Sequence, residues 1–328
     1  MRVVATEEHF VTTSVMDAWR SLDPAWQDLA LGPSTEDVRG RRLREIGPER
    51  LGLMDDVGVD TQVLSLGPPG LQNLEPDTAV ALQSETNDHL AEVVRGSDRY
   101  EGFAALATPA PEKAADELER AVRTLGLEGA MVYGRTRERN FDHPDFWPIF
   151  EAASALRAPL YLHAQSPPLA VREAYYSGFD PALAAGLATA GIGWHYETGV
   201  QVVRMMLAGV FDRFPDLQII LGHWGEVALF YLDRVDELWR TAGVAKRPSE
   251  YARSNVIVTA GGLLDQRYLR WSIEMVGIER VLFASDYPFV SHSSGAARRF
   301  LEEADLSETE RSLIASDNWA ALRAGIRR

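Results

Sequence analysis

Five residues with metal-binding chemistry follow short apolar runs of the sequence. They are Glu7, His9, His163, His223 and Asp286. Each closes a run typical of a buried strand, where a carboxylate or imidazole is costly unless it is paired or binds a cation. Oxygen and nitrogen ligands of this kind suit Zn²⁺, Mn²⁺ or Fe²⁺. A single such residue is more often a helix cap or a packed side chain, so the metal-site prediction depends on all five occurring together.

The triplet Glu7-Glu8-His9 directly follows the first of these runs. In an extended chain, residues two apart point to the same side, so Glu7 and His9 converge while Glu8 points away. The pair can offer one carboxylate oxygen and one imidazole nitrogen to a single cation. Such a triplet also occurs by chance, and a surface Glu beside a loop His is the plainer alternative.

His223 lies between two glycines, and Glu226 follows it by three residues. We expect Glu226 to begin a helix that reaches about Trp239 and to accept the imidazole N–H, which orients the ring. On that helix Arg234 is two turns beyond Glu226, about 12 Å along the axis. It can therefore reach a ligand or a neighbouring subunit, and a surface ion pair is an equally open interpretation.

Eight apolar runs alternate with helical patterns along the whole chain, which predicts an α/β fold and favours a closed (β/α)₈ TIM barrel of one domain, residues 1–328. The expected strands are Val3–Thr6, Thr61–Leu66, Phe103–Leu106, Gly129–Val132, Pro159–Leu162, Leu217–Leu221, Asn255–Thr259 and Val281–Ala284. In such a barrel the carboxyl ends of the strands meet at one rim, where sites are built.

The segment 164–216 is longer than an ordinary connection between strands. We expect a helical and loop insertion after the fifth strand that forms a pocket wall or an oligomer contact. Trp194, at the start of a helix in this insertion, can face the pocket, with structural packing as the alternative.

Composition excludes several classes of partner. The formal net charge of -15 and a pI near 5.0 argue against binding to nucleic acid or to an anionic membrane. The sequence contains no Cys and lacks an apolar run long enough to span a bilayer, and its first residues do not resemble a signal peptide. We therefore expect a cytoplasmic protein.

Four sequence motifs resemble the amidohydrolase superfamily. They are Ala5-Thr6-Glu7-Glu8-His9-Phe10, Tyr161-Leu162-His163, Ile220-Leu221-Gly222-His223-Trp224-Gly225-Glu226 and Phe283-Ala284-Ser285-Asp286-Tyr287-Pro288-Phe289. The resemblance is greatest to the aromatic decarboxylase branch, which includes γ-resorcylate, 2,3-dihydroxybenzoate and 5-carboxyvanillate decarboxylases and the related aminocarboxymuconate semialdehyde decarboxylase. The segment Trp194-His195-Tyr196-Glu197-Thr198 is similar to this branch as well.

Two departures from other superfamily members refine the placement. Hydrolytic members commonly open with His-x-His, whereas this chain has Glu7-x-His9, as the benzoate-type decarboxylases do. Binuclear members often carry a carbamylated Lys on the fourth strand, but Gly129–Tyr133 contains none. The resemblance therefore implies one divalent metal ion, Zn²⁺ or Mn²⁺.

The resemblance also implies residue roles. Glu7, His9, His163 and Asp286 become metal ligands, and Asp286 is in addition the catalytic acid. His223 lies over the substrate and is oriented by Glu226.

Arg234 matches a position implicated in substrate binding, and Trp194 is assigned to the substrate pocket. The relatives are dimers or tetramers, so a homodimer or homotetramer is expected.

The predicted reaction is non-oxidative decarboxylation of a hydroxylated aromatic carboxylic acid, reversible in principle. The first alternative is a metal-dependent hydrolase acting on an amide, lactone or ester, or a hydratase, on the same barrel. The second is a barrel that has kept only a binding role.

Overall fold

In the computed structural model, which describes residues 1–328 except for the Asp37 side chain, eight parallel strand positions surround a central core. The strands are β1 (Val4–Phe10), β2 (Thr61–Leu66), β3 (Tyr100–Gly102) with β4 (Ala104–Ala105), β5 (Ala130–Tyr133), β8 (Leu160–His163), β9 (Ile219–Leu221), β10 (Val256–Thr259) and β11 (Val281–Leu282). Each predicted strand overlaps one of these positions, so the α/β prediction is confirmed.

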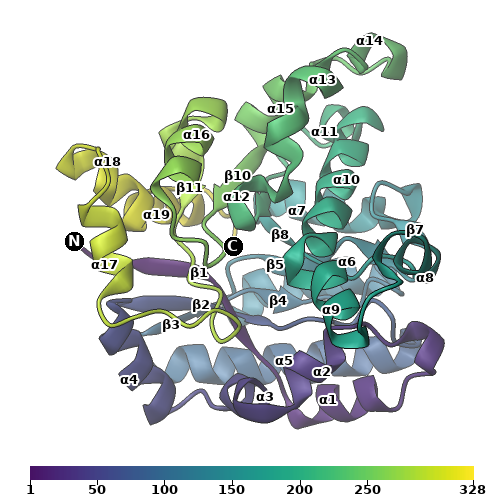
Figure 1. Cartoon of the computed structure of the whole chain (residues 1–328), viewed down its shortest axis with the longest axis horizontal. Helices are drawn as coiled ribbons and strands as arrows, with labels where there is room; N and C mark the ends of the chain where they lie inside the picture. Colours follow the sequence, from purple (N-terminus) through teal and green to yellow (C-terminus); the bar gives the residue numbers. More distant parts are fainter.

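Backbone hydrogen bonds join the strands into a closed barrel. The strand order is β1-β2-β3 in one sheet and β11-β10-β9-β8-β5-β4 in the other. The two sheets meet at two junctions. Phe103 N donates to Leu64 O at 2.8 Å at one junction, and Thr6 N donates to Phe283 O at 3.0 Å at the other. The strands that surround the core pair in parallel, so their carboxyl ends lie on one rim. Figure 1 shows β1, β2 and β3 side by side.

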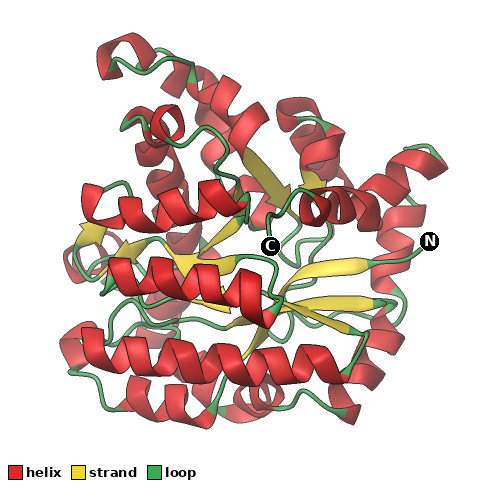
Figure 2. Ribbon diagram, turned by 180° about the vertical axis from the view of Figure 1, so that it is seen from behind, coloured by secondary structure: helices red, strands yellow, loops and turns green.

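Helices cover the outside of the barrel (Figure 2). Their bounds are α1 (Thr13–Arg20), α2 (Leu31–Thr35), α3 (Asp37–Arg44), α4 (Pro48–Val57), α5 (Pro76–Gly96), α6 (Pro111–Arg120), α7 (Trp147–Leu156), α8 (Leu169–Val171), α9 (Pro181–Gly186), α10 (Gly193–Leu207), α11 (Val210–Arg213), α12 (His223–Glu226), α13 (Leu232–Asp236), α14 (Trp239–Ala242), α15 (Pro248–Asn255), α16 (Gln266–Val276), α17 (Ala296–Glu302), α18 (Glu308–Ser312) and α19 (Asn318–Ala324). Several begin at Pro, whose missing N–H costs nothing in a first helical turn. A small antiparallel pair, β6 (Arg135–Thr136) and β7 (Arg139–Asn140), lies after β5.

The interior of the barrel is filled by side chains from all eight strand positions. This buried cluster includes Val4, Val63, Phe103, Met131, Tyr161, Ile220, Ile257 and Leu282. Trp319 of α19 packs against the same cluster, and its indole N–H donates to Glu101 at 2.6 Å. Because the barrel is packed rather than hollow, chemistry is confined to its rims.

The continuous helix predicted after His223 is wrong. The structure has α12, a 3₁₀ turn over Ala228–Tyr231, α13 and α14 in its place. Trp224, Gly225 and Val227 have φ values of 58°, 86° and 57°, so α12 is a short left-handed turn and no right-handed helix runs through these residues. The spacing of Arg234 from Glu226 along a single axis therefore does not apply.

The connection from β8 to β9 contains α8, α9, α10 and α11. These helices lie together at one side of the barrel (Figure 1). No helix within the described residues has both the length and the apolar character required to cross a bilayer.

Candidate metal centre

The structure brings four of the predicted residues together at the carboxyl rim, and we call them the Glu7 cluster: Glu7, His9, His163 and Asp286. Each offers one ligand atom, and these atoms lie within 4.8 Å of one another. His163 Nε2 is 3.3 Å from Glu7 Oε1, and His9 Nε2 is 3.4 Å from Asp286 Oδ1. All four residues are buried. They come from β1, β8 and the loop after β11.

Two atoms of the Glu7 cluster point to a bound cation. Among the described residues, Glu7 Oε1 and His9 Nε2 are buried without a hydrogen-bond partner. A buried polar atom left unsatisfied costs about 1–3 kcal/mol. Two imidazoles and two carboxylates around such atoms fit one divalent ion of the Zn²⁺ or Mn²⁺ type.

The second nitrogen of each imidazole in this cluster has its own neighbour. His163 Nδ1 is 2.9 Å from Ala164 O, and His9 Nδ1 is 3.3 Å from Ser65 Oγ. Partners of this kind orient metal-binding imidazoles, and here they leave both Nε2 atoms facing the cluster.

Three further residues around Glu7 were not predicted as part of the site. Glu7 Oε2 accepts hydrogen bonds from Tyr161 Oη at 2.5 Å and from Thr259 Oγ1 at 3.3 Å. A Cβ at Gly222 would lie 2.9 Å from the same oxygen, so a larger residue there would displace the Glu7 carboxylate. Tyr161 could have been found from the sequence, because it precedes His163 by two residues and therefore points to the same side of its strand.

A second acid–imidazole group, which we call the Glu226 cluster, consists of His195, His223 and Glu226. Glu226 lies between the two imidazoles, with Oε1 2.7 Å from His223 Nδ1 and Oε2 2.7 Å from His195 Nδ1. The predicted contact between His223 and Glu226 is therefore present. His195, from α10, was not predicted as its second partner.

The backbone around His223 is strained. His223 and Glu226 have φ values of 46° and 54°. Left-handed backbone costs a residue with a side chain about 1–2 kcal/mol. Strain of this kind collects at functional sites, where the surrounding structure holds it in place.

His223 connects the two clusters. Its Nε2 lies 3.9 Å from Glu7 Oε1 and 4.0 Å from Asp286 Oδ2. Burial alone would lower the pKa of His223, but the charges of Glu226 and Glu7 raise it to about 10. Burial and the Glu7 charge raise the pKa of Asp286 to about 8. Burial would also raise the pKa of Glu7, yet His223 and His163 hold it below its ordinary value. Asp286 is therefore the better proton carrier of the two carboxyls.

A cavity of about 290 Å³ adjoins the Glu226 cluster. Its lining includes His195, Tyr196, His223, Phe230, Tyr231 and Trp271. Small-molecule sites usually measure about 300–1,000 Å³ and are lined largely by apolar and aromatic side chains. The cavity therefore suits a single aromatic ring.

Two predicted substrate-binding residues lie away from this cavity. Trp194 is buried, and its Nε1 donates to Ser166 Oγ at 3.0 Å beside the chain that leaves β8. Arg234 is exposed on α13, outside the lining of the cavity.

Comparison with known proteins places this geometry in a family. A family model described as amidohydrolase matches residues 9–322. The γ-resorcylate decarboxylase of Polaromonas sp. is 34% identical over 335 residues, which cover 96% of each chain.

Solved structures agree. The crystal structure of 5-carboxyvanillate decarboxylase from Sphingomonas paucimobilis is 34% identical, with a TM-score of 0.89 over 98% of this chain and 99% of that one. A dihydroxybenzoic acid decarboxylase from Polaromonas sp., solved with manganese and the inhibitor 2-nitroresorcinol, is 31% identical, with a TM-score of 0.84 over 98% of this chain and 97% of that one. This likeness extends over nearly the whole barrel, and the chain belongs to the amidohydrolase family.

Proposed function

We propose that this protein is a metal-dependent decarboxylase that removes the carboxyl group of a hydroxylated aromatic acid without oxidation. The observation that carries the proposal is the Glu7 cluster, whose unpartnered atoms face a protonatable Asp286 and a cationic His223. The relatives described above are all named decarboxylases. Their activity supports this function over the hydrolase or hydratase alternative.

Glu7, His9, His163 and Asp286 are the proposed ligands of one divalent ion, Mn²⁺ or Zn²⁺. When bound, the ion supplies positive charge that offsets the substrate carboxylate and its neighbouring hydroxyl oxygen. Manganese is favoured because a relative has been solved with it.

Asp286 is the proposed acid. Protonation of the ring carbon that bears the carboxylate interrupts aromaticity, so the acid must lie close to that carbon. Asp286 gives up its proton there, the carbon–carbon bond then breaks, its electron pair returns to the ring, and CO₂ leaves. A proton from water restores the acid. Burial raises the pKa of Asp286 and so favours its protonated form, while the charge of a bound cation would act in the opposite direction.

His223 is proposed to stabilise the negative charge that the substrate oxygen gains when aromaticity is lost. Glu226 accepts the hydrogen bond from Nδ1 and keeps the ring cationic, so Nε2 points as a donor toward the Glu7 cluster. Fixed charge in a buried site stabilises a developing charge without further reorganisation.

The rest of the chain is proposed to form one domain around this site. Residues 164–216 are the proposed pocket wall, which is supported by the positions of His195 and Tyr196 in the cavity lining. Trp194 would support that wall and Arg234 would attract the substrate carboxylate. A homodimer or homotetramer in the cytoplasm stays a prediction.

The decisive experiment supplies the purified protein with Mn²⁺ or Zn²⁺ and a panel of ortho-hydroxylated benzoates that includes γ-resorcylate and 5-carboxyvanillate. We expect one CO₂ for each phenol formed and, in D₂O, one deuterium at the carbon that lost its carboxylate. Absence of CO₂ from every member, combined with cleavage of amide, lactone or ester substrates, would overturn the proposal.

A further inference from the structure

Glu8 lies between two proposed ligands but points away from them, as the strand alternation predicted. It is fully buried. Its Oε1 accepts from Ser285 N at 2.8 Å, and its Oε2 accepts from Gln62 Nε2 at 2.7 Å. Ser285 Oγ lies 2.8 and 2.7 Å from the same two oxygens. Glu8 thus joins β1 to β2 and to the loop after β11.

The partners of Glu8 are oriented so that both of its oxygens must accept. Arg50 Nε donates to Gln62 Oε1 at 2.6 Å, so the amide must turn its NH₂ group toward Glu8. The other fixed donor is the backbone N–H of Ser285, which cannot act as an acceptor. Arg50 also donates to His9 O at 2.7 Å, on the backbone of a proposed ligand. We call these four residues, Arg50, Gln62, Glu8 and Ser285, the Glu8 clamp.

The two segments that the clamp joins are irregular. The pairing of β1 with β2 shifts register between Ala5 and Glu8, where Glu7 lies. Asp286, directly after Ser285, has a φ of 56° in the left-handed region. Irregular backbone persists only where its surroundings hold it.

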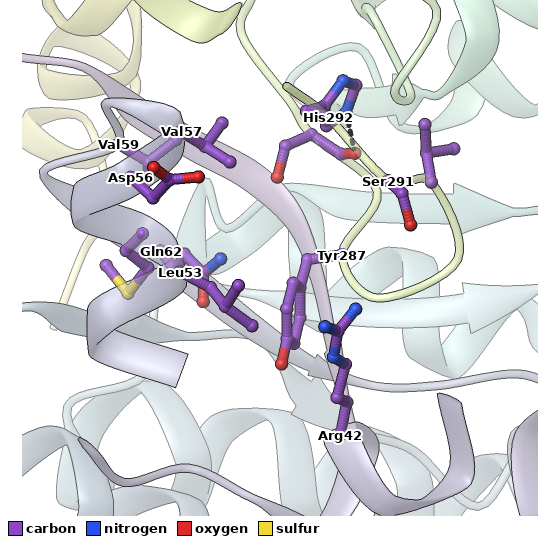
Figure 3. Close-up of a pocket in the computed structure, with 12 residues that line it drawn as sticks. Arg42, Leu53, Asp56, Val57, Val59, Gln62, Tyr287, Ser291 and His292 are labelled. Atoms are coloured by element: carbon purple, nitrogen blue, oxygen red, sulfur yellow. Dashed lines mark hydrogen bonds between the residues drawn. The ribbon is translucent and has the colours of Figure 1, made fainter. Parts of the chain in front are cut away.

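Side-chain packing alone does not keep the two irregular segments in place. A cavity of about 160 Å³ adjoins the clamp, and Gln62 and Ser285 help to line it. Gln62 and Tyr287 are seen at this cavity in Figure 3. His292 reaches Ser285 O across this cavity at 2.8 Å. Backbone hydrogen bonds hold the segment on either side of Ser285, from Thr6 N to Phe283 O at 3.0 Å and from His9 N to Tyr287 O at 2.8 Å. Glu8 holds the part between them, because it accepts from the Ser285 N–H and hydroxyl.

We propose that Glu8 is a positioning residue, which fixes the spacing between the Glu7–His9 pair and Asp286 so that all can bind one ion. The proposal rests on the metal centre argued above. Glu8 touches neither substrate nor metal, and its effect passes through the backbone of Ser285 and His9.

The test measures Mn²⁺ binding to the full chain after chelation, by titration and by electron paramagnetic resonance, in wild type and Glu8→Gln. The glutamine keeps the size but places an NH₂ group against a fixed donor. We expect Mn²⁺ affinity to fall about 10–100-fold, as loss of such supporting partners typically does. The resonance of bound Mn²⁺ should change shape, and kcat at saturating Mn²⁺ should fall more than KM rises.

Ser285→Ala is the milder second variant, because it removes the hydroxyl and keeps the N–H. We expect its loss of Mn²⁺ affinity to be smaller than that of Glu8→Gln. The fold-loss in the double variant should be less than the product of the two single fold-losses. Glu117→Gln is the matched control. Glu117 is also a buried carboxylate, but its partners Asn87 and Arg120 belong to the outer helices.

Wild-type affinity and an unchanged Mn²⁺ resonance in Glu8→Gln would overturn the proposal, even if its Tm fell. If Glu8→Gln does not fold, the same result in Ser285→Ala would overturn it. A wild type that binds no Mn²⁺ would instead refute the metal centre, so the two failures are distinguishable.

Discussion

The Glu7 and Glu226 clusters lie side by side and are built from the same residue types, yet their hydrogen bonding differs. In the Glu226 cluster both imidazoles are 2.7 Å from the carboxylate that they share. In the Glu7 cluster, the imidazole-to-carboxylate distances are 3.3 and 3.4 Å, and two buried atoms lack a hydrogen-bond partner among the described residues. The hydrogen bonds of the Glu226 cluster are therefore satisfied within the cluster, whereas the Glu7 cluster has atoms left to bind a further group such as a cation.

This difference separates two chemical roles that residue type alone does not separate. Either cluster offers enough ligand atoms for a metal ion. In the Glu226 cluster, however, an ion would have to displace two short hydrogen bonds between charged or dipolar groups, which are among the stronger ones in proteins. We therefore assign the ion to the Glu7 cluster and hydrogen-bonded orientation of His223 to the Glu226 cluster.

Removing a ligand gives the largest expected effect. His163→Ala takes one nitrogen from the Glu7 cluster, so we expect loss of bound Mn²⁺ and of turnover to background. Chelation of the wild type should cause the same loss, reversed by added Mn²⁺. Metal content by mass spectrometry and CO₂ release are the measurements. His143→Ala is the control, since His143 caps a short helical turn at the surface. An active, metal-loaded His163→Ala would break the distinction between the clusters.

Asp286→Asn tests the acid separately from the metal. The amide keeps an oxygen for the ion but has no acidic proton, so kcat should fall by about 10²–10⁴-fold, the usual contribution of a general acid. Substrate binding, measured by titration of the metal-loaded variant, should change little. A rate near that of wild type would remove Asp286 from proton transfer and leave it a ligand at most.

The contrast between the clusters also marks what the sequence could predict. The Glu7 cluster follows from strand alternation and from the shared rim of parallel strands, because Glu7 and His9 lie two residues apart in β1 and His163 is the last residue of β8. Apolar runs identify such strands well, so residues far apart in sequence could be brought together.

The Glu226 cluster was predictable only in part. His223 and Glu226 are three residues apart, but His195 is 31 residues from Glu226, in a connection without strand alternation. The break after His223 had one visible signal, Gly225. Trp224 and Val227 adopt positive φ as well, which bulky and β-branched residues avoid unless tertiary contacts impose it.

Glu226→Gln examines the second cluster. The neutral amide can accept from one imidazole but not from both, so His223 loses the charge that keeps it cationic. We expect kcat to fall about 10–100-fold, as for other supporting partners of a site. Mn²⁺ content should stay at the wild-type level.

His195→Gln provides the comparison for that variant, because it removes the outer imidazole and leaves the His223–Glu226 bond in place. Its kcat should fall less. Loss of Mn²⁺ from either variant would contradict the separation of the clusters, since it would show that the Glu226 cluster also holds the ion.

Arg234 lies outside both clusters, and we expect the smallest effect there. A chain with a net charge of -15 repels a carboxylate unless positive charge is placed locally, and an exposed Arg on α13 can supply it. Arg234→Ala should raise KM for the aromatic acid by up to about tenfold with kcat unchanged, the pattern of lost binding that is equal in ground and transition states. Arg240→Ala, another exposed position nearby, is the control, and an unchanged KM in Arg234→Ala would return Arg234 to an ordinary surface role.

If KM does rise, mixed oligomers of Arg234→Ala and Asp286→Asn subunits separate two geometries. An arginine that serves its own subunit leaves the mixture with the raised KM, because each subunit lacks one group. An arginine that serves its neighbour restores the wild-type KM in those sites where an intact Asp286 faces a partner with an intact Arg234.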